Sequence, residues 1–232
     1  MPLLVVIGYG PGNGHAIAER FGREGWTIAL VGRHAERLHD GVEQLAAVGV
    51  TARPFTGDAG DPVSLRATLT SIRGDLGPVT AFALTAYRNV VVDDVLAADP
   101  GTVAQVFDIA VTGLLTAVQT TLDDLRAAGS ASVLVVNGAL GLQDDTIDEY
   151  AVSFGGDGVA LECSAKTKLV GLLAARLRTE DIYVGEIVIN GSVKGSPYAG
   201  PTAIDPADIA DRLWRMAEER TEVHVHIAEQ RA

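Results

Sequence analysis

Short runs of apolar, often β-branched residues recur along the chain, and segments with helical spacing of apolar positions lie between them. Most runs are nearly all apolar rather than alternating, which is typical of strands covered on both faces, as in a parallel sheet. The predicted strands are residues 3–7, 27–31, 51–56, 79–84, 131–136, 183–189 and 222–227. No linker, repeat or charge run divides the 232 residues, so we expect one domain spanning residues 1–232.

The segments between the predicted strands read as amphipathic helices. Three of them are predicted to begin at a capping aspartate followed by a proline, at Asp61-Pro62, Asp99-Pro100 and Asp205-Pro206. The strict alternation of strands and helices, joined by right-handed crossovers, predicts an α/β fold. We expect a Rossmann-like doubly wound, seven-stranded and mostly parallel sheet with helices on both faces. Ligands in such sheets bind beyond the carboxyl ends of the strands.

Composition removes several classes of function. The formal net charge is −12, and the basic residues are scattered among more numerous acidic ones. A nucleic-acid or anionic-membrane partner needs a clustered basic surface, so we expect neither. Cys163 is the only cysteine, so no intrachain disulfide can form. The opening MPLLVVIGYG lacks the charged start of a leader and is too short to span a bilayer, and we expect a cytoplasmic protein.

A glycine-rich turn follows the first predicted strand, in the sequence GYGPGNGHAIAERF. Glycines permit a tight turn and let the backbone approach a pyrophosphate closely. The start of the next helix supplies N–H groups and the positive end of a dipole. Because the turn has a strand before it and a helix after it, the sequence predicts a phosphate-binding turn. Its residues are Gly8, Gly10, Gly12, Asn13 and Gly14.

The ends of the first two strands indicate which nucleotide binds. Methyltransferases that use S-adenosylmethionine usually carry an acid at each of these ends, and both acids are missing here. In proteins that bind NAD, an acidic residue at the end of the second strand bonds the ribose, and Gly32 stands near that position here. Arg33 offers a planar cation to the 2′-phosphate of NADP. His34 and Arg37 offer further donors. We therefore favour NADP(H) over NAD(H); the alternative is that Arg33 is a solvated arginine at a helix start.

These features together resemble the short-chain dehydrogenase/reductase family. The pattern Gly8-x-x-x-Gly12-x-Gly14 is similar to the family's glycine motif, and ALVGRHAERL is similar to its NADP-preferring second strand and turn. The resemblance covers essentially the whole chain. It implies an enzyme that reduces a carbonyl or oxidises an alcohol. In the family, a tyrosine exchanges the proton, a lysine four residues later holds the nicotinamide ribose, and a serine and an asparagine complete the site.

Only the lysine of these four positions matches, at Lys166 in CSAKTKLVGLLAARL. Glu162 stands at the tyrosine position, Gly138 at the serine position and Ala110 at the asparagine position. The resemblance thus implies a divergent member that lacks the catalytic serine and tyrosine. The cofactor contacts that it implies are Gly8, Gly10, Gly12, Asn13, Gly14, Arg33, Asp58, Ala59, Ala86, Tyr87, Lys166, Gly191 and Val193.

Several of these residues have a second interpretation. Lys166 should lower the pKa of Glu162 below its usual value of about 4.3, which makes it a poor proton donor unless desolvation reverses the shift. Glu162 and Lys166 are therefore candidate catalytic residues, and a plain i,i+4 ion pair is the alternative. Asp58 could contact the adenine or serve as a turn residue. Tyr87 could supply a displaced hydroxyl, but we favour its filling the emptied pocket.

Three further segments carry polar side chains near the expected site. Tyr150 lies in the acidic loop QDDTIDEY, with Asp144, Asp145, Asp148 and Glu149; this loop could attract a cationic substrate, although a solvated loop is the simpler interpretation. The Gly/Pro-rich residues 191–205 could form a lid, with Lys194 and Tyr198 touching ligand. His224 and His226 share a strand face but lack a third ligand, so we predict no metal site.

Two functions remain open. One is an NADP(H)-dependent oxidoreductase with a degenerate catalytic site, and the other is an NADP(H)-binding sensor or partner protein that performs no turnover. Because family members commonly pair through their long helices, here about residues 100–127 and 157–178, we also expect a homodimer or homotetramer.

Overall fold

The computed structural model of the chain describes residues 1–88, 92–197 and 199–229, and within them a single seven-stranded sheet. Its strand order is β3-β2-β1-β4-β5-β6-β7, and every pairing is parallel. The strands are β1 (Leu3–Ile7), β2 (Thr27–Gly32), β3 (Ala52–Thr56), β4 (Ala81–Leu84), β5 (Ala131–Gly138), β6 (Ile182–Asn190) and β7 (His224–Ala228). This is the doubly wound fold predicted from the sequence. The order reverses between β1 and β4, which is where such sheets bind ligands.

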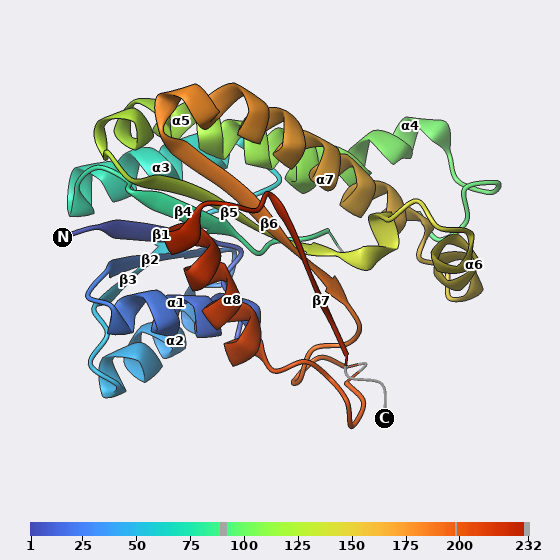
Figure 1. Ribbon diagram of the computed structural model, residues 1–232, viewed down its shortest axis with the longest axis horizontal. Helices are drawn as coiled ribbons and strands as arrows, with labels where there is room; N and C mark the ends of the chain where they lie inside the picture. The colour runs from blue at the N-terminus through green and yellow to red at the C-terminus, as the bar shows by residue number, and fades with distance from the viewer. Residues whose placement is uncertain (89–91, 198, 230–232) are drawn as a thin grey trace.

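Helices cover both faces of the sheet, as Figure 1 shows. One face carries α1 (Asn13–Arg23), α2 (Ala35–Ala47) and α8 (Pro206–Glu219), and the other carries α3 (Pro62–Leu76), α5 (Leu114–Ala127) and α7 (Asp157–Leu177). The inner strands therefore send alternate side chains into two separate hydrophobic cores, one on each side of the sheet, whereas β7 contributes only to the core on the face of α1, α2 and α8. This two-sided burial is why the inner strands are almost wholly apolar, whereas the edge strands β3 and β7 are largely exposed.

The three aspartate-proline starts form as predicted. The Asp61 carboxylate accepts from the Val63 N–H at 2.9 Å at the start of α3. Asp99 and Asp205 cap α4 (Pro100–Val103) and α8 in the same way. Each cap supplies one of the acceptors that the first helical turn lacks, a contribution of about 1 kcal/mol.

The predicted long helix over residues 100–127 is wrong in detail. The segment is split into α4, a 3₁₀ turn η1 (Ala104–Val106), a π-helical turn η2 (Asp108–Gly113) and α5. At the end of the π turn the backbone packs tightly, because a Cβ at Gly113 would lie 2.3 Å from the carbonyl O of Ala59. The spacing of apolar residues cannot reveal this contact, since it is made with a distant loop.

Of the remaining helical elements, the first two follow β5 at its carboxyl end, and the third precedes β6 at its amino end. They are η3 (Ala139–Gly141), α6 (Asp145–Ser153) and η4 (Arg178–Glu180). Within the described residues no single helix is both long and apolar enough to cross a membrane. The bent pair Pro100–Val106 and Asp108–Ala127 meets the criterion by length and composition alone, a criterion that buried core helices also meet.

Candidate functional site

The glycine turn is fixed between β1, β2 and β4. The N–H groups of Gly8 and Tyr9 both donate to the Val31 carbonyl, at 2.9 and 2.8 Å. Gly8 has a φ of +95°, and a Cβ there would lie 2.4 Å from the Ala86 nitrogen, so only glycine fits. Gly10 and Gly12, by contrast, face open space. The turn thus leaves room for a ligand above its middle residues.

The start of α1 offers unused hydrogen-bonding groups to such a ligand. Its cap residue, Gly12, supplies no side chain, and the first turn contains no acidic residue. The Asn13 side-chain oxygen is buried and has no hydrogen-bond partner among the described residues. An uncapped helix start favours an anion such as a pyrophosphate, and the Asn13 oxygen can accept from a hydroxyl or amide of the same ligand. These residues fit a dinucleotide.

The end of β2 presents cations to the same region. Gly32 closes the strand, and Arg33 and Arg37 are exposed. Neither arginine forms an ion pair within the part of the chain that the structure describes, so both guanidinium groups are available to a phosphate. Asp58 adopts the turn role that was one of its two interpretations, because its Oδ1 accepts from the Gly60 N–H at 2.8 Å. Ala59 beside it is buried.

Glu162 and Lys166 form a buried pair rather than a surface ion pair. The Lys166 Nζ lies 3.4 Å from the Glu162 Oε1, and both side chains are 2% exposed. The Lys166 Nζ also lies 3.5 Å from the Ala86 carbonyl, and the Arg88 N–H donates to the Glu162 Oε2 at 3.1 Å. The segment Thr85–Arg88 therefore covers both charged groups.

The expected direction of the Glu162 pKa is wrong. Burial raises the pKa of this carboxyl above its ordinary value, and the nearby Lys166 ammonium and Arg88 N–H offset only part of that effect. The spacing of the two residues reveals the charge of Lys166, but it does not reveal how completely the pair is removed from water. A carboxyl group shifted in this direction is a better proton donor near neutral pH than an exposed one.

Further contacts hold the segment Thr85–Arg88 in place. The Thr85 hydroxyl donates to the Gly8 carbonyl at 2.9 Å, and the Arg88 guanidinium pairs with Asp108 of η2 at 2.9 Å. The segment thus connects the glycine turn to the buried pair. Because Lys166 is covered in this way, its ammonium can touch a ligand only when the segment shifts.

Both candidate tyrosines have exposed side chains. Tyr87 is 66% exposed, so our expectation that it fills the emptied pocket is wrong. Its position at the exposed side of the covering segment explains this, because the backbone of that segment, and not the ring, lies over Glu162. Tyr150 is 64% exposed and packs on Phe154, with ring centroids 5.1 Å apart.

The serine and asparagine positions carry no polar side chain. Ala110 is fully buried in η2, and a Cβ at Gly138 would meet the Cys163 sulfur at 3.2 Å. Neither can orient a substrate oxygen through a side chain.

A buried polar network that sequence reasoning missed lies beside Gly138. Asn137 donates to the Glu186 Oε2 at 3.0 Å, and the His224 Nδ1 lies 2.7 Å from the Glu186 Oε1. Asn137 also donates to Thr167 on α7 at 2.9 Å. The network ties β5, β6, β7 and α7 together. The sequence contains a sign of this network, because Glu186 is the single charged residue in the apolar run YVGEIVI.

The loop after β6 is held by the end of the chain. Gly191 has a φ of +143°, and Ser192 donates through its N–H and its hydroxyl to the Glu229 Oε1, at 2.5 and 2.6 Å. Val193 pairs with Ile204. The Lys194 ammonium lies 3.0 Å from Asp205, so it stabilises the α8 cap in this state.

Two candidates remain to be placed. Tyr198 lies outside the described residues. His226 is exposed on β7, and no group of three metal-binding side chains occurs in the described part of the chain.

Comparison with known proteins agrees with this architecture. The sequence profile described as short chain dehydrogenase matches residues 3–151. No match was found among curated proteins. L-sorbose reductase from Gluconobacter frateurii, solved with NADPH and L-sorbose, has a TM-score of 0.84 at 18% identity, with 98% of this chain and 95% of that chain covered.

Two further solved structures are similar to the same extent. A 3-ketoacyl-ACP reductase from Sinorhizobium meliloti 1021 has a TM-score of 0.84 at 18% identity, covering 98% of this chain and 97% of its own. A metagenomic short-chain oxidoreductase in complex with NADP has a TM-score of 0.82 at 19% identity, covering 99% and 98%. With the profile match across most of the chain, the protein belongs to the short-chain dehydrogenase family.

Proposed function

We propose that the chain binds NADP(H) and acts as an oxidoreductase on a carbonyl or alcohol substrate. The observation that carries the proposal is the uncapped start of α1, where the buried Asn13 oxygen has no partner among the described residues. The exposed guanidinium of Arg33 and the complexes of two similar proteins with NADPH and NADP support it.

Each residue of the site would have a role that suits its chemistry. The N–H groups at the start of α1 would hold the pyrophosphate, and Arg33 would bind the 2′-phosphate bidentately. Lys166 would hold the nicotinamide ribose after the segment Thr85–Arg88 has shifted. The cofactor supplies or accepts a hydride at the substrate carbon. After the same shift, Glu162 would give the matching proton to the substrate oxygen in reduction, or remove it in oxidation, and the raised pKa of this carboxyl supports that role.

A second function, NADP(H) binding without turnover, also has an observation in its favour. The positions that orient substrate in the family hold Gly138 and the buried Ala110, and Lys166 is covered by the protein's own backbone. On this alternative the Glu162–Lys166 pair would anchor the segment Thr85–Arg88, and its displacement by a nucleotide would be the signal.

Nucleotide affinity tests the shared part of both functions. We expect NADPH to bind more tightly than NADH in calorimetric titration. Arg33→Ala should lower the affinity for NADPH about tenfold or more, because it removes one charge-assisted contact. Its affinity for NADH should be nearly unchanged. Arg178→Ala is the matched control, because Arg178 is exposed at the opposite end of the strands. Equal affinities of wild type and Arg33→Ala for NADPH would contradict the role of Arg33, and failure to bind either nucleotide would refute both functions.

Turnover separates the two functions. NADPH consumption would be followed with a panel of ketones, aldehydes and ketoacyl thioesters, using wild type, Lys166→Ala and Glu162→Gln. The oxidoreductase requires turnover in wild type that Lys166→Ala abolishes and Glu162→Gln strongly reduces. Tight NADPH binding without consumption across the panel supports the sensor, and equal turnover in all three proteins would refute the assigned roles.

A further inference from the structure

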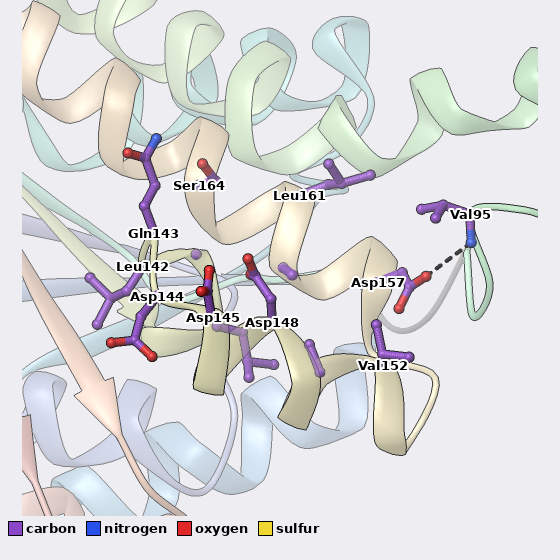
Figure 2. A pocket seen from close by; sticks show the side chains of 14 residues that line it. Val95, Leu142, Gln143, Asp144, Asp145, Asp148, Val152, Asp157, Leu161 and Ser164 are labelled. Carbon is purple, nitrogen blue, oxygen red and sulfur yellow. Dashed lines mark hydrogen bonds between the residues drawn. The ribbon is translucent and has the colours of Figure 1, made fainter.

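A cavity of about 450 Å³ lies between η3, α6 and the first turns of α7. Figure 2 shows the fourteen side chains that line it. Leu140, Leu142, Val152 and Leu161 supply apolar surface. The polar side is dominated by four carboxylates, those of Asp144, Asp145, Asp148 and Asp157. The cavity thus combines an apolar wall with a strong negative charge.

Within the described part of the chain, no basic side chain lines this cavity to balance its charge. Asp144 caps α6 by accepting from the Thr146 N–H at 2.9 Å, but a cap leaves its charge in place. Asp145 and Asp148 are exposed and form no ion pair within the described residues. Like charges gathered around one cavity attract a cation from solution.

Asp157 supplies an independent reason to expect a ligand. This residue is 9% exposed, and its Oδ2 accepts from the Val95 N–H at 2.9 Å. Its Oδ1 is buried and has no hydrogen-bond partner among the described residues. Leaving such an acceptor unsatisfied is costly, so the position favours a donor brought by a ligand. The Val95 N–H satisfies the Oδ2 of this carboxylate and leaves the Oδ1 without a donor among the described residues.

The arrangement suits an organic cation better than a metal ion. A divalent metal needs several oxygen atoms that converge on one point. In the described part of the chain no three acidic, histidine or cysteine side chains come close enough to hold one. Carboxylates distributed along a partly apolar cavity instead match an ammonium or guanidinium group on a hydrocarbon chain.

We propose that this cavity binds the cationic end of the substrate, an alkylammonium or alkylguanidinium group. The inference rests on the proposed function only in taking the bound cation to be part of the substrate. The two sites share α7, because Ala160, Leu161 and Ser164 line the cavity while Glu162 and Lys166 lie on the same turns. The substrate class is then an amino-ketone or amino-alcohol, with the cation held apart from the reacting carbon.

Direct binding to the cofactor-free protein tests this. Hexylammonium chloride is the probe, and 1-hexanol and sodium hexanoate are its neutral and anionic counterparts. We expect hexylammonium to bind, as measured by calorimetry and ligand-observed NMR, hexanol to bind at least tenfold more weakly, and hexanoate not to bind. Asp157→Asn keeps an acceptor for the Val95 N–H but loses the charge, and it should weaken hexylammonium about tenfold. Added salt should weaken hexylammonium and leave hexanol unchanged.

Two further variants make the result decisive. Asp145→Asn/Asp148→Asn changes only exposed residues, so it should fold normally and also weaken hexylammonium. Asp123→Asn is the matched control, because Asp123 is 85% exposed on α5. The affinity of this variant for hexylammonium should equal that of wild type. Equal binding of hexylammonium and hexanol, or unchanged affinity in both cavity variants, would overturn the proposal.

The same protein preparations would be titrated with NADPH. Hexylammonium binding without NADPH binding would support the cation site and refute the proposed function. NADPH binding without hexylammonium binding would overturn the cation site alone.

Discussion

Two opposite charges buried side by side make Glu162 and Lys166 mutually dependent. Each would be strongly destabilising alone, because an ion removed from water needs its partner and its hydrogen bonds. Glu162 accepts from the Arg88 N–H, and Lys166 lies within reach of the Ala86 carbonyl. The sequence spacing identified the partners, but it could not reveal their burial, because the covering residues are 74 to 80 positions away.

Replacing either Glu162 or Lys166 alone should lower the free energy of unfolding far more than replacing both. We expect Glu162→Gln and Lys166→Met each to lower the free energy of unfolding by about 3–5 kcal/mol, the usual effect of breaking a buried pair. The double variant should recover most of that loss. Urea unfolding followed by tryptophan fluorescence measures all four proteins, and additive losses would show that the two residues do not interact.

The raised pKa of Glu162 also predicts how stability depends on pH. Between its unfolded and folded pKa values this carboxyl binds more protons in the folded protein, so its contribution to stability is present at low pH and lost as pH rises. The slope from one such group is at most about 1.4 kcal/mol per pH unit.

Glu162→Gln should lack this component. Urea unfolding at a series of pH values above about 4.5 would show the free energy of unfolding of wild type falling relative to the variant as pH rises. A difference that stays constant or grows with pH would contradict the pKa direction.

At the scale of elements, the strands and helix starts followed from local chemistry. Apolar runs located all seven strands to within two residues at every boundary, and the aspartate-proline pairs marked the starts of α3, α4 and α8. The broken helix between Pro100 and Ala127 did not follow, because its π turn ends where Gly113 meets the loop after β3. Local patterns describe what a segment prefers, and only the packed fold shows what its neighbours impose.

Two glycines in helical segments should respond oppositely to the same substitution. Gly113→Ala would place a Cβ 2.3 Å from the Ala59 carbonyl, so we expect it to lower the free energy of unfolding by about 1–3 kcal/mol. Gly74→Ala in α3 meets no atom within 4 Å and should raise it by about 0.5–1 kcal/mol. Thermal and urea unfolding of both variants measure the effect. Stabilisation by Gly113→Ala would show that the close approach is absent in solution.

At the scale of the whole molecule, the two cores and the strand order place the glycine turn, the buried pair and the acidic cavity at the carboxyl ends of the strands. The sequence predicted that location because parallel strands share one end. It could not predict the cavity, whose lining comes from Val95, from α7, and from η3 and α6 with the residues that join them. No local pattern specifies how these segments pack together.

We propose that the chain forms a homodimer or homotetramer through α5 and α7, which cover the same face of the sheet (Figure 1). Leu172 on α7 is 53% exposed and offers an apolar contact there. Leu172→Glu should reduce the sedimentation coefficient to that of a smaller species, while Val63→Glu, at a residue of α3 that is 78% exposed, should not. A monomeric wild type would refute the proposed assembly.

The attachment of Ser192 and Thr202 to Glu229 has a practical consequence for anyone who expresses the protein. A truncation before Glu229 would remove the carboxylate that accepts from Ser192 and Thr202 and so loosen the loop after β6. Met1, by contrast, is 99% exposed and precedes β1 at the opposite end of the sheet. An affinity tag at the amino terminus is therefore placed away from Glu229 and from the loop that it fastens.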